Sequence, residues 1–318
     1  MTQMQTESPL LPERLAPTRD ASVSGVAGLG LSTLFLFAER APWLLRLLKP
    51  IAVRGAIRFS SSISLCVREN ARVIFGRELA TDEARVFNRA VVANFYDFVL
   101  DVGRSGAMSA RELRERIESV HGIEGYHAAR AAGRGALFVT AHMGAFEVGL
   151  AALREWEPKV HVVFKRDSFG GFERIRSRVR AMLGVTEAPI DEGFGSLVQL
   201  RDALLANEVV VMQGDRAMPG QRAQVVPFLH GHLRLPLGPV KLAQLTGSPI
   251  IPVFLVRGER GGFHVHLTEP IEVDGESEPI DGVDPALRRI AQAIESFVKK
   301  YPQQWLVLNC AFVSGAAS

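Results

Sequence analysis

The sequence predicts an α/β fold: a single layered domain with a mainly parallel sheet flanked by helices, preceded by an N-terminal helix that associates with a membrane. Three observations predict it. Hydrophobic residues make up 47% of the 318 residues and charged residues 22%, which is enough to bury a large core. Short apolar runs alternate with helical patterns after residue 135. An uncharged run and a basic, apolar segment precede residue 60.

The N-terminal region divides into two parts. Residues 1–20 are polar and contain proline, so we expect a disordered lead. Residues 21–38 carry no charge and reach the lower limit of a membrane-spanning helix, whereas residues 40–58 alternate apolar and basic side chains, as an interfacial helix does. We therefore predict that residues 21–58 associate with a membrane, either spanning it or lying flat. The alternative is an amphipathic helix packed on the protein's own core.

Charge and cysteine content exclude several classes of protein. A formal net charge of +3 suits phospholipid headgroups or an acidic carrier protein, but it is too small to indicate nucleic-acid binding. The chain has only two cysteines, Cys66 and Cys310, far apart and without a recognisable partner spacing. They argue against a disulfide scaffold and a Cys-x-x-Cys zinc site, and they favour a reducing compartment.

The elements follow in order along the chain. Residues 84–103 show helical periodicity, and Ser109 with Glu112 forms a capping-box pattern. Apolar, β-branched runs predict strands at residues 135–141, 159–164, 209–212, 249–256 and 263–267. Helical patterns lie at residues 146–154, 172–183, 197–206 and 238–245, and a last helix begins at Asp284-Pro285. In such a fold the functional site lies at the carboxyl ends of the strands.

The most informative motif is Thr-Ala-His-Met-Gly-Ala-Phe-Glu-Val-Gly, at residues 140–149. A strand leads to His142, Gly144 permits a turn, and Glu147 lies in the following helix. On one continuous helix the two side chains would point about 140° apart, but a strand–turn–helix lets them meet. A carboxylate on one ring nitrogen leaves the other nitrogen free to accept a proton from a substrate hydroxyl. The alternative is a single histidine satisfied by a backbone carbonyl.

This motif resembles the first block of the lysophospholipid acyltransferase superfamily, in which the histidine and the acidic residue form a catalytic dyad. With glutamate at position 147, the motif most resembles that of the bacterial lipid A late acyltransferase (lauroyl/myristoyl acyltransferase) branch. Further blocks follow in the family's order at residues 162–166, 212–220, 226–231, 242–254 and 301–306, so the resemblance covers roughly residues 25–312. The chain departs from the branch at Arg216, where glutamine is expected, and at Asn309, near where histidine is common.

The resemblance implies a catalytic domain over residues 60–312 that works as a membrane-bound O-acyltransferase. His142 would be the general base and Glu147 its orienting partner. Arg166, with Lys165, Asp215 and Arg216 as weaker candidates, would hold the polar head of a glycolipid acceptor of the lipid A precursor type. The acyl donor would be a thioester of acyl carrier protein or coenzyme A, with no metal or organic cofactor. The location implied is the cytoplasmic face of the inner membrane.

Other functions remain open from the sequence. The acceptor could instead be a lysophospholipid or an amino-acid-containing lipid. A lipid-binding protein without turnover would be favoured if His142 and Glu147 lay too far apart to hydrogen-bond. A metal-dependent hydrolase would use the pairs His230/His232 and His264/His266, although neither pair has an obvious third ligand nearby. No Gly-x-Ser-x-Gly motif is present, so a covalent serine intermediate is not expected.

Overall fold

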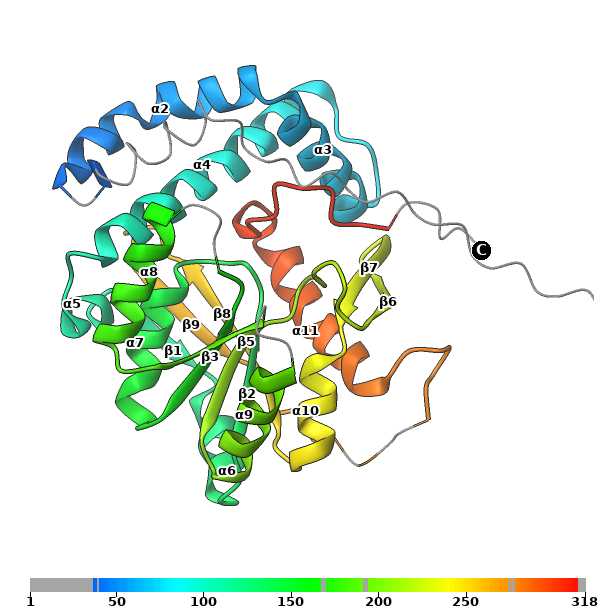
Figure 1. Ribbon diagram of the computed structural model, residues 1–318. Helices are drawn as coiled ribbons and strands as arrows, with labels where there is room; N and C mark the ends of the chain where they lie inside the picture. Colours follow the sequence, from blue (N-terminus) through cyan, green and yellow to red (C-terminus); the bar gives the residue numbers. More distant parts are fainter. Residues whose placement is uncertain are drawn as a thin grey trace, which may run out of the picture.

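The computed structural model describes residues 37–38, 40–166, 170–190, 194–273, 275 and 278–313. A seven-stranded sheet carries helices on both faces, and a layer of helices lies across one end of it (Figure 1). The predicted disordered lead at residues 1–20 and nearly all of the uncharged run at residues 21–38 lie outside the described residues. The α/β architecture predicted from the sequence is confirmed.

The sheet is mainly parallel. Its strand order is β1-β9-β8-β2-β5-β3-β4, and every neighbouring pair is parallel except β8 and β9. The strands are β1 (Ile117–His121), β2 (Ala136–Thr140), β3 (Val160–Phe164), β4 (Thr186–Pro189), β5 (Val209–Gln213), β8 (Ile250–Arg257) and β9 (Phe263–Leu267). A separate antiparallel hairpin consists of β6 (Ala223–Phe228) and β7 (Gly231–Pro236).

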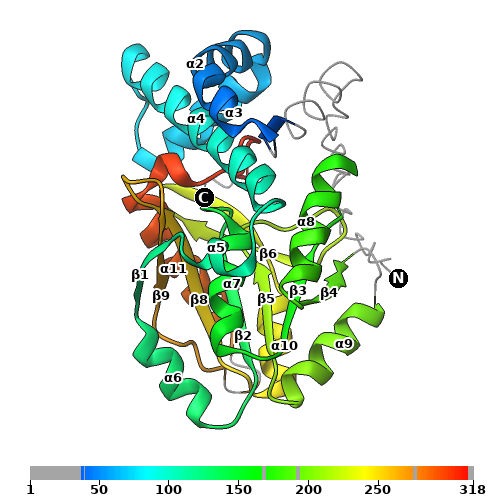
Figure 2. The same cartoon turned by 90° about the vertical axis from the view of Figure 1, so that its left-hand side faces the viewer.

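Helices cover both faces, so the central strands are apolar throughout rather than alternating. Along β2, Leu137 and Val139 join one buried cluster, while Phe138 points to the other face and joins a second cluster. The first face is covered by α9 (Phe194–Leu205), α10 (Gly238–Thr246) and α11 (Pro285–Lys300). The second is covered by α5 (Ala110–Arg114), α6 (Ile123–Ala131), α7 (Phe146–Trp156) and α8 (Gly170–Met182). Figure 2 shows α7 in front of the sheet, with α10 and α11 behind it.

The N-terminal helices form the layer across the end of the sheet. They are α2 (Pro42–Phe59), α3 (Ser61–Phe75) and α4 (Thr81–Ser105). On one side of α2, Leu45 and Val53 are buried against α4, while Trp43, Leu47 and Ile51 on another side are each at least 66% exposed. The helix is therefore packed on the protein along one stripe and presents a second apolar stripe outward. Within the described part of the chain, no helix is long and apolar enough to cross a membrane.

Local signals located most elements correctly. Glu112 N donates to Ser109 Oγ and Ser109 N donates to Glu112 Oε2, which completes the predicted capping box of α5. Asp284 Oδ1 accepts from the backbone N–H groups of Ala286 and Leu287 at the start of α11. The sequence analysis did not predict α3 as an element, although it is 15 residues long. It also did not predict β1, α6, β4 or the β6–β7 hairpin, whose runs are short and partly exposed.

The expectation about the cysteines was wrong. Cys66 on α3 and Cys310 near the C-terminus form a disulfide, although 244 positions separate them in the sequence. Spacing could not reveal this pair, because the fold brings the last residues of the chain back to the N-terminal helices. The inference of a reducing compartment from unpaired cysteines therefore loses its basis.

Candidate active site

His142 is placed by the sharp bend that follows β2. All five residues of β2 are buried, and the bend turns at Gly144, which has a φ of +65°. A Cβ atom at Gly144 would lie 2.4 Å from the carbonyl oxygen of Leu255, so only glycine fits there. The bend leaves the His142 side chain 22% exposed at the carboxyl end of the sheet, which is where the sequence analysis expected the site.

The carboxylate that contacts His142 is Asp215. Strand β5 is the neighbour of β2, and Gly214 N donates to Thr140 O just before both chains leave the sheet. Asp215 is fully buried, with Oδ1 2.6 Å from His142 Nδ1, and Oδ2 accepts from His142 N at 3.0 Å. Burial alone raises the pKa of Asp215, but the His142 ring, its hydrogen bonds and Arg216 outweigh burial and hold the pKa well below its usual value.

Glu147 does not make the hydrogen bond that the sequence analysis expected. It lies in the first turn of α7, but its side chain is directed to α8, where Arg176 Nε donates to Oε1 at 2.7 Å. Oε2 is buried without a hydrogen-bond partner. Helix α7 begins only at Phe146, and its first turn directs Glu147 away from His142. The carboxylate that contacts His142 follows strand β5 instead.

The expectation that Asp215 holds the polar head of an acceptor is also wrong. Its side chain has no exposed surface, and its oxygens already accept from groups of the protein. Asp215 therefore acts on its neighbours, above all on the ring of His142. By the criterion stated from the sequence, the missing His142–Glu147 hydrogen bond favours a lipid-binding protein without turnover. The structure does give the His142 ring a different carboxylate partner, Asp215.

Arg216 contacts the outer nitrogen of the same ring. Arg216 Nη2 lies 3.1 Å from His142 Nε2, and Nη1 donates to Asn309 Oδ1 at 3.1 Å. A guanidinium can only donate hydrogen bonds. Nε2 must therefore accept, which places the ring hydrogen on Nδ1, where it is donated to Asp215. This is the tautomer that a general base needs.

The last residues of the chain form the third side of the site. We call residues 302–313 the C-terminal strap; it begins with the 3-10 helix η2 (Pro302–Gln304). Trp305 is 2% exposed and its Nε1 donates to Asp215 Oδ2 at 2.8 Å, while Leu306 N donates to His142 O at 2.8 Å. The strap thus holds both members of the His142–Asp215 pair.

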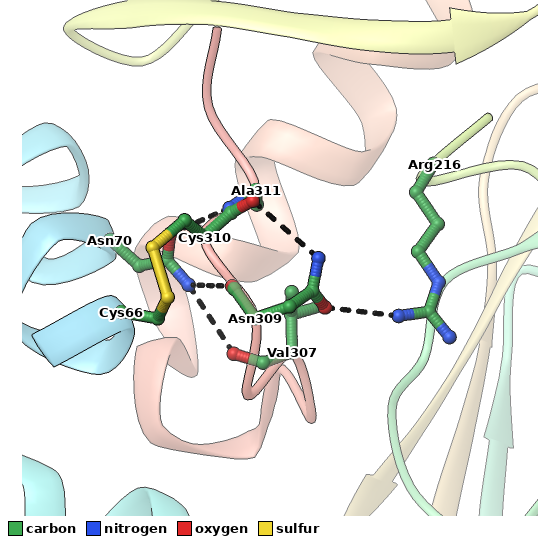
Figure 3. Close-up of a disulfide and its surroundings, with 7 residues drawn as sticks. All are labelled: Cys66, Asn70, Arg216, Val307, Asn309, Cys310 and Ala311. Carbon is green, nitrogen blue, oxygen red and sulfur yellow. Dashed lines mark hydrogen bonds between the residues drawn. A yellow bond between two sulfur atoms is a disulfide. The ribbon is translucent and has the colours of Figure 1, made fainter. Parts of the chain in front are cut away.

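The strap is itself anchored to α3. Asn70 Nδ2 donates to the carbonyl oxygens of Val307 and Asn309, at 3.3 Å and 2.9 Å, and Ala311 N donates to Asn70 Oδ1 at 3.0 Å. The Cys66–Cys310 disulfide lies beside these bonds (Figure 3). Figure 3 also shows Asn309 between this anchor and Arg216, so α3 is connected through the strap to the side chain on His142 Nε2.

Lys165 and Arg166 occupy the residues directly after β3, and both are exposed. Strand β3 is the other neighbour of β5, so the two side chains start from the same edge of the sheet as His142 and Asp215. The sequence analysis located them correctly at a strand end.

The two histidine pairs do not form a metal centre. Among the described residues, no group of three or more histidine, cysteine, aspartate or glutamate side chains has a geometry that could hold an ion. His264 and His266 lie on β9 at an outer part of the sheet, where His266 stacks on His121. Burial, together with His121, Lys300 and His264, lowers the pKa of His266 to about 4, so this ring is neutral at neutral pH.

An apolar pocket extends from the bend between α7 and the sheet. Met143 and Phe146 lie at the end near His142, Gly149 lies midway along α7, and Trp156 lies at the far end. Strands β2, β5, β8 and β9 supply the opposite wall. Thr140 and the glycine apart, the lining side chains are hydrophobic, so the pocket suits a hydrocarbon chain.

A histidine–carboxylate pair next in sequence to Met143, which lines an apolar pocket, is consistent with transfer of a fatty acyl group. Comparison with known proteins decides the family. A family model described as bacterial lipid A biosynthesis acyltransferase matches residues 22–313. The chain belongs to this acyltransferase family. The resemblance stated from the sequence motifs is thereby confirmed, and the protein is an acyltransferase.

Curated relatives of this acyltransferase are named phosphatidylinositol mannoside acyltransferases. One from Mycolicibacterium smegmatis is 25% identical over 229 residues, which cover 71% of this chain and 72% of the relative. Two from Mycobacterium tuberculosis strains are 27% and 26% identical over 285 residues, covering 86% of this chain and 87% of each relative.

Sequence reasoning did not predict two of the contacts around His142. It gave Asp215 a role in acceptor binding, although a Gly-Asp pair at the end of an apolar strand was a usable sign of a residue at the carboxyl edge. It took Trp305 only as part of a closing motif, and nothing in the local pattern shows that its indole reaches a residue 90 positions away.

Proposed function

We propose that this chain transfers a fatty acyl group from a thioester of acyl carrier protein or coenzyme A to a hydroxyl of a glycolipid acceptor. The observation that carries the proposal is the His142–Asp215 pair, whose histidine directly precedes Met143 in the lining of the apolar pocket. The names of the curated relatives support a glycolipid as the acceptor class. A lysophospholipid and an amino-acid-containing lipid are the alternatives that the experiment below separates.

In the proposed mechanism His142 Nε2 accepts the proton of the acceptor hydroxyl while Asp215 stabilises the imidazolium that forms. The hydroxyl oxygen bonds to the thioester carbonyl carbon, the carbon–sulfur bond breaks, and the imidazolium returns the proton to the departing thiolate. Atoms and charge balance without a covalent enzyme intermediate, a metal or an organic cofactor. Because Arg216 Nη2 occupies Nε2 in the structure, the guanidinium must move aside when the hydroxyl binds.

In the proposed complex, Arg166, Lys165 and the displaced Arg216 bind the polar head of the acceptor, because all three start at the carboxyl edge of the sheet. Guanidinium groups hold phosphate and carboxylate oxygens in paired hydrogen bonds. The acyl chain of the donor lies in the pocket beneath α7, which puts the thioester carbonyl next to Met143 and His142.

We further propose that the protein works at the cytoplasmic face of the plasma membrane, where the proposed thioester donors are found. The exposed side of α2 supports the membrane association alone, since Trp43, Leu47, Ile51 and Phe59 are all at least 66% exposed. Arg54 and Arg58 follow on the same helix, so apolar insertion and attraction to lipid phosphates act together.

Lipid mass spectrometry tests the function. The purified full-length protein, given acyl-carrier-protein or coenzyme A thioesters and lipids extracted from its own source, should produce one lipid heavier by one acyl chain. A deletion strain should accumulate the matching lighter lipid, whose head group identifies the acceptor. A deletion strain with an unchanged lipid profile, together with no transfer in vitro to any extracted lipid, would refute the proposal.

The pocket predicts a change in chain-length preference. A Cβ at Gly149 would meet Leu255 only at ordinary contact distance, so Gly149→Leu should fold and fill the middle of the pocket. We expect the preferred acyl chain to become shorter by several carbons, with kcat/KM for long chains falling about 10- to 100-fold. Competition among thioesters of graded chain length measures this. A matched substitution on α7 outside the pocket lining, Glu155→Leu, which removes a carboxylate paired with Arg114, should leave the preference unchanged. An unaltered preference in Gly149→Leu would place the chain elsewhere.

Trp305 is proposed as a positioning residue for Asp215. Trp305→Phe keeps a ring near Phe228 and Phe312 but removes the N–H that Asp215 Oδ2 accepts. A hydrogen bond to a charged group is worth about 1.5–3 kcal/mol, so we expect kcat to fall about 10- to 100-fold. A carboxylate with one donor fewer binds the imidazolium more tightly, so the acid limb of the kcat/KM profile should move to higher pH.

The pH profile separates positioning from packing. If Trp305→Phe lowers only the melting temperature and leaves the pH profile of the folded enzyme unchanged, its role is structural. Phe312→Leu, which alters packing against the same indole without removing a donor, is the control and should leave the acid limb in place.

A further inference from the structure

Arginines from separate segments gather around one carboxylate below α2. Asp101 on α4 is 4% exposed; its Oδ1 accepts from Arg116 Nη2 at 2.7 Å, and its Oδ2 accepts from Arg257 Nη2. Arg116 precedes β1 and Arg257 ends β8, and both guanidinium groups lie 4.8 Å from the centre of the Phe263 ring. Both oxygens of Asp101 are therefore already used by these two arginines.

Two more arginines join this pair, and we call Arg46, Arg104, Arg116 and Arg257 the arginine cluster. Arg104 lies three residues after Asp101 on α4, so the two side chains share a helix face. Arg46 comes from α2, next to Leu45, whose carbonyl oxygen accepts from Tyr96 on α4. The other nearby acid of α4, Asp97, is paired with Lys49 at 2.7 Å. Within the described residues, neither Arg46 nor Arg104 has an acidic partner.

The cluster is electrostatically unbalanced. Burial, together with Arg46, Arg116 and Arg257, lowers the pKa of Arg104, and Asp101 opposes this only partly. The carboxyl end of α4 favours a cation at Arg104, but a helix terminus carries only about half a charge. Arg116 Nη1 is in addition buried without an acceptor. Like charges held together with a donor unsatisfied are costly unless an anion completes the set.

A small hollow lies between Arg257 of this cluster and the bend that carries His142. Arg257 lines it, together with Asn94 and Phe98 of α4 and Gln304 and Leu306 of the C-terminal strap. Gly144, the residue at which the His142 bend turns, belongs to the same lining. One member of the arginine cluster, Arg257, therefore lies in the same hollow as the bend at Gly144, beside α4.

We propose that the arginine cluster binds a phosphate group of a substrate, with Arg104 and Arg46 as its main ligands. Guanidinium groups suit phosphate because they donate paired, charge-assisted hydrogen bonds. The inference rests on the proposed function for the identity of the substrate. The phosphate belongs either to the phosphopantetheine arm of the acyl donor or to a lipid head group, and both would approach from the side of α2 and the strap.

Titration of the full-length protein with inorganic phosphate tests the site without turnover. Arg104→Gln should weaken phosphate binding about tenfold, the loss of one charged hydrogen-bond donor. The control is Arg72→Gln, which removes an equal charge from the exposed surface of α3, where Arg72 contacts only Glu69. Should Arg104→Gln not fold, Arg46→Gln at the exposed rim replaces it. Equal phosphate affinity in wild type, Arg104→Gln and Arg72→Gln would overturn the proposal, as would the absence of saturable binding in the wild type.

Two kinetic arms separate the sources. S-acyl-phosphopantetheine and S-acyl-pantetheine differ only in the phosphate. If the donor phosphate binds, Arg104→Gln should raise KM about tenfold for the first donor and leave KM for the second unchanged. If a lipid phosphate binds, the two donors should respond alike, and binding to phosphatidylglycerol vesicles should weaken relative to Arg72→Gln. Phosphate binding without any acyl transfer would refute the proposed function but not the site.

Discussion

Replacing Asp215 with asparagine should lower kcat about 10³-fold or more, with little change in KM. The amide keeps the shape of the side chain but cannot stabilise an imidazolium, and it presents an N–H or a neutral oxygen to His142 Nδ1 in place of a charged acceptor. Loss of the orienting carboxylate in comparable histidine sites costs about 10⁴-fold. Steady-state kinetics with a single thioester donor, normalised to the folded fraction, measures the effect.

Two further variants make this result decisive. His142→Ala should abolish transfer and leave vesicle binding unchanged, since α2 and the site lie on separate segments. Glu147→Gln should behave differently from Asp215→Asn: it leaves Arg176 with a weaker buried partner, so the protein should lose stability while the folded fraction keeps most of its kcat. If Glu147→Gln lost as much kcat as Asp215→Asn, the assignment of the histidine's partner would have to be reversed.

The second large effect concerns the disulfide. Cys66 and Cys310 close a loop across 244 positions of sequence, and the chain-entropy model gives about 5 kcal/mol of stabilisation for a loop of that size. The double variant Cys66→Ser, Cys310→Ser should therefore unfold at a clearly lower urea concentration than the oxidised wild type. Equilibrium unfolding followed by tryptophan fluorescence, to which Trp305 in the strap contributes, measures the shift.

The reduced wild type is the matched control for this experiment. In dithiothreitol it should unfold at nearly the same urea concentration as the double serine variant, because both lack only the covalent link. Asn70 still holds the strap in these forms, so we expect the native baseline to keep its fluorescence. Coincident unfolding curves for the oxidised wild type and the double variant would mean that the link contributes nothing to stability.

The fold was largely predictable because its signals are local. Apolar β-branched runs and helical periods identify β2, β3, β5, β8 and β9 within a residue or two, and caps such as Asp284 fix where helices start. The half-exposed β1 and β4 lack such runs. Which strands become neighbours depends on contacts between residues far apart in the sequence, so the strand order could not be predicted from local patterns.

The site shows the same division. His142 was located from its own strand, turn and glycine. Its partner was assigned to Glu147 because that carboxylate is near in sequence, whereas Asp215 is near only because β5 lies beside β2 in the sheet. Trp305 and Asn309 reach the site through a strap that returns from the far end of the chain. The disulfide was missed for the same reason.

The covalent connection of α3 to the strap has a consequence for locating the protein in the cell. Denaturation does not open the ring that the two sulfur atoms close, so oxidised and reduced chains should migrate differently on a non-reducing gel. Glutathione and thioredoxin keep thiols reduced on the cytosolic side of a membrane, whereas disulfide bonds persist on the other side. The protein is taken from cells whose thiols have been blocked with an alkylating agent, and its gel mobility is measured. The mobility of the oxidised form would place the catalytic domain outside the cytosol, and that of the reduced form would place it on the cytosolic side.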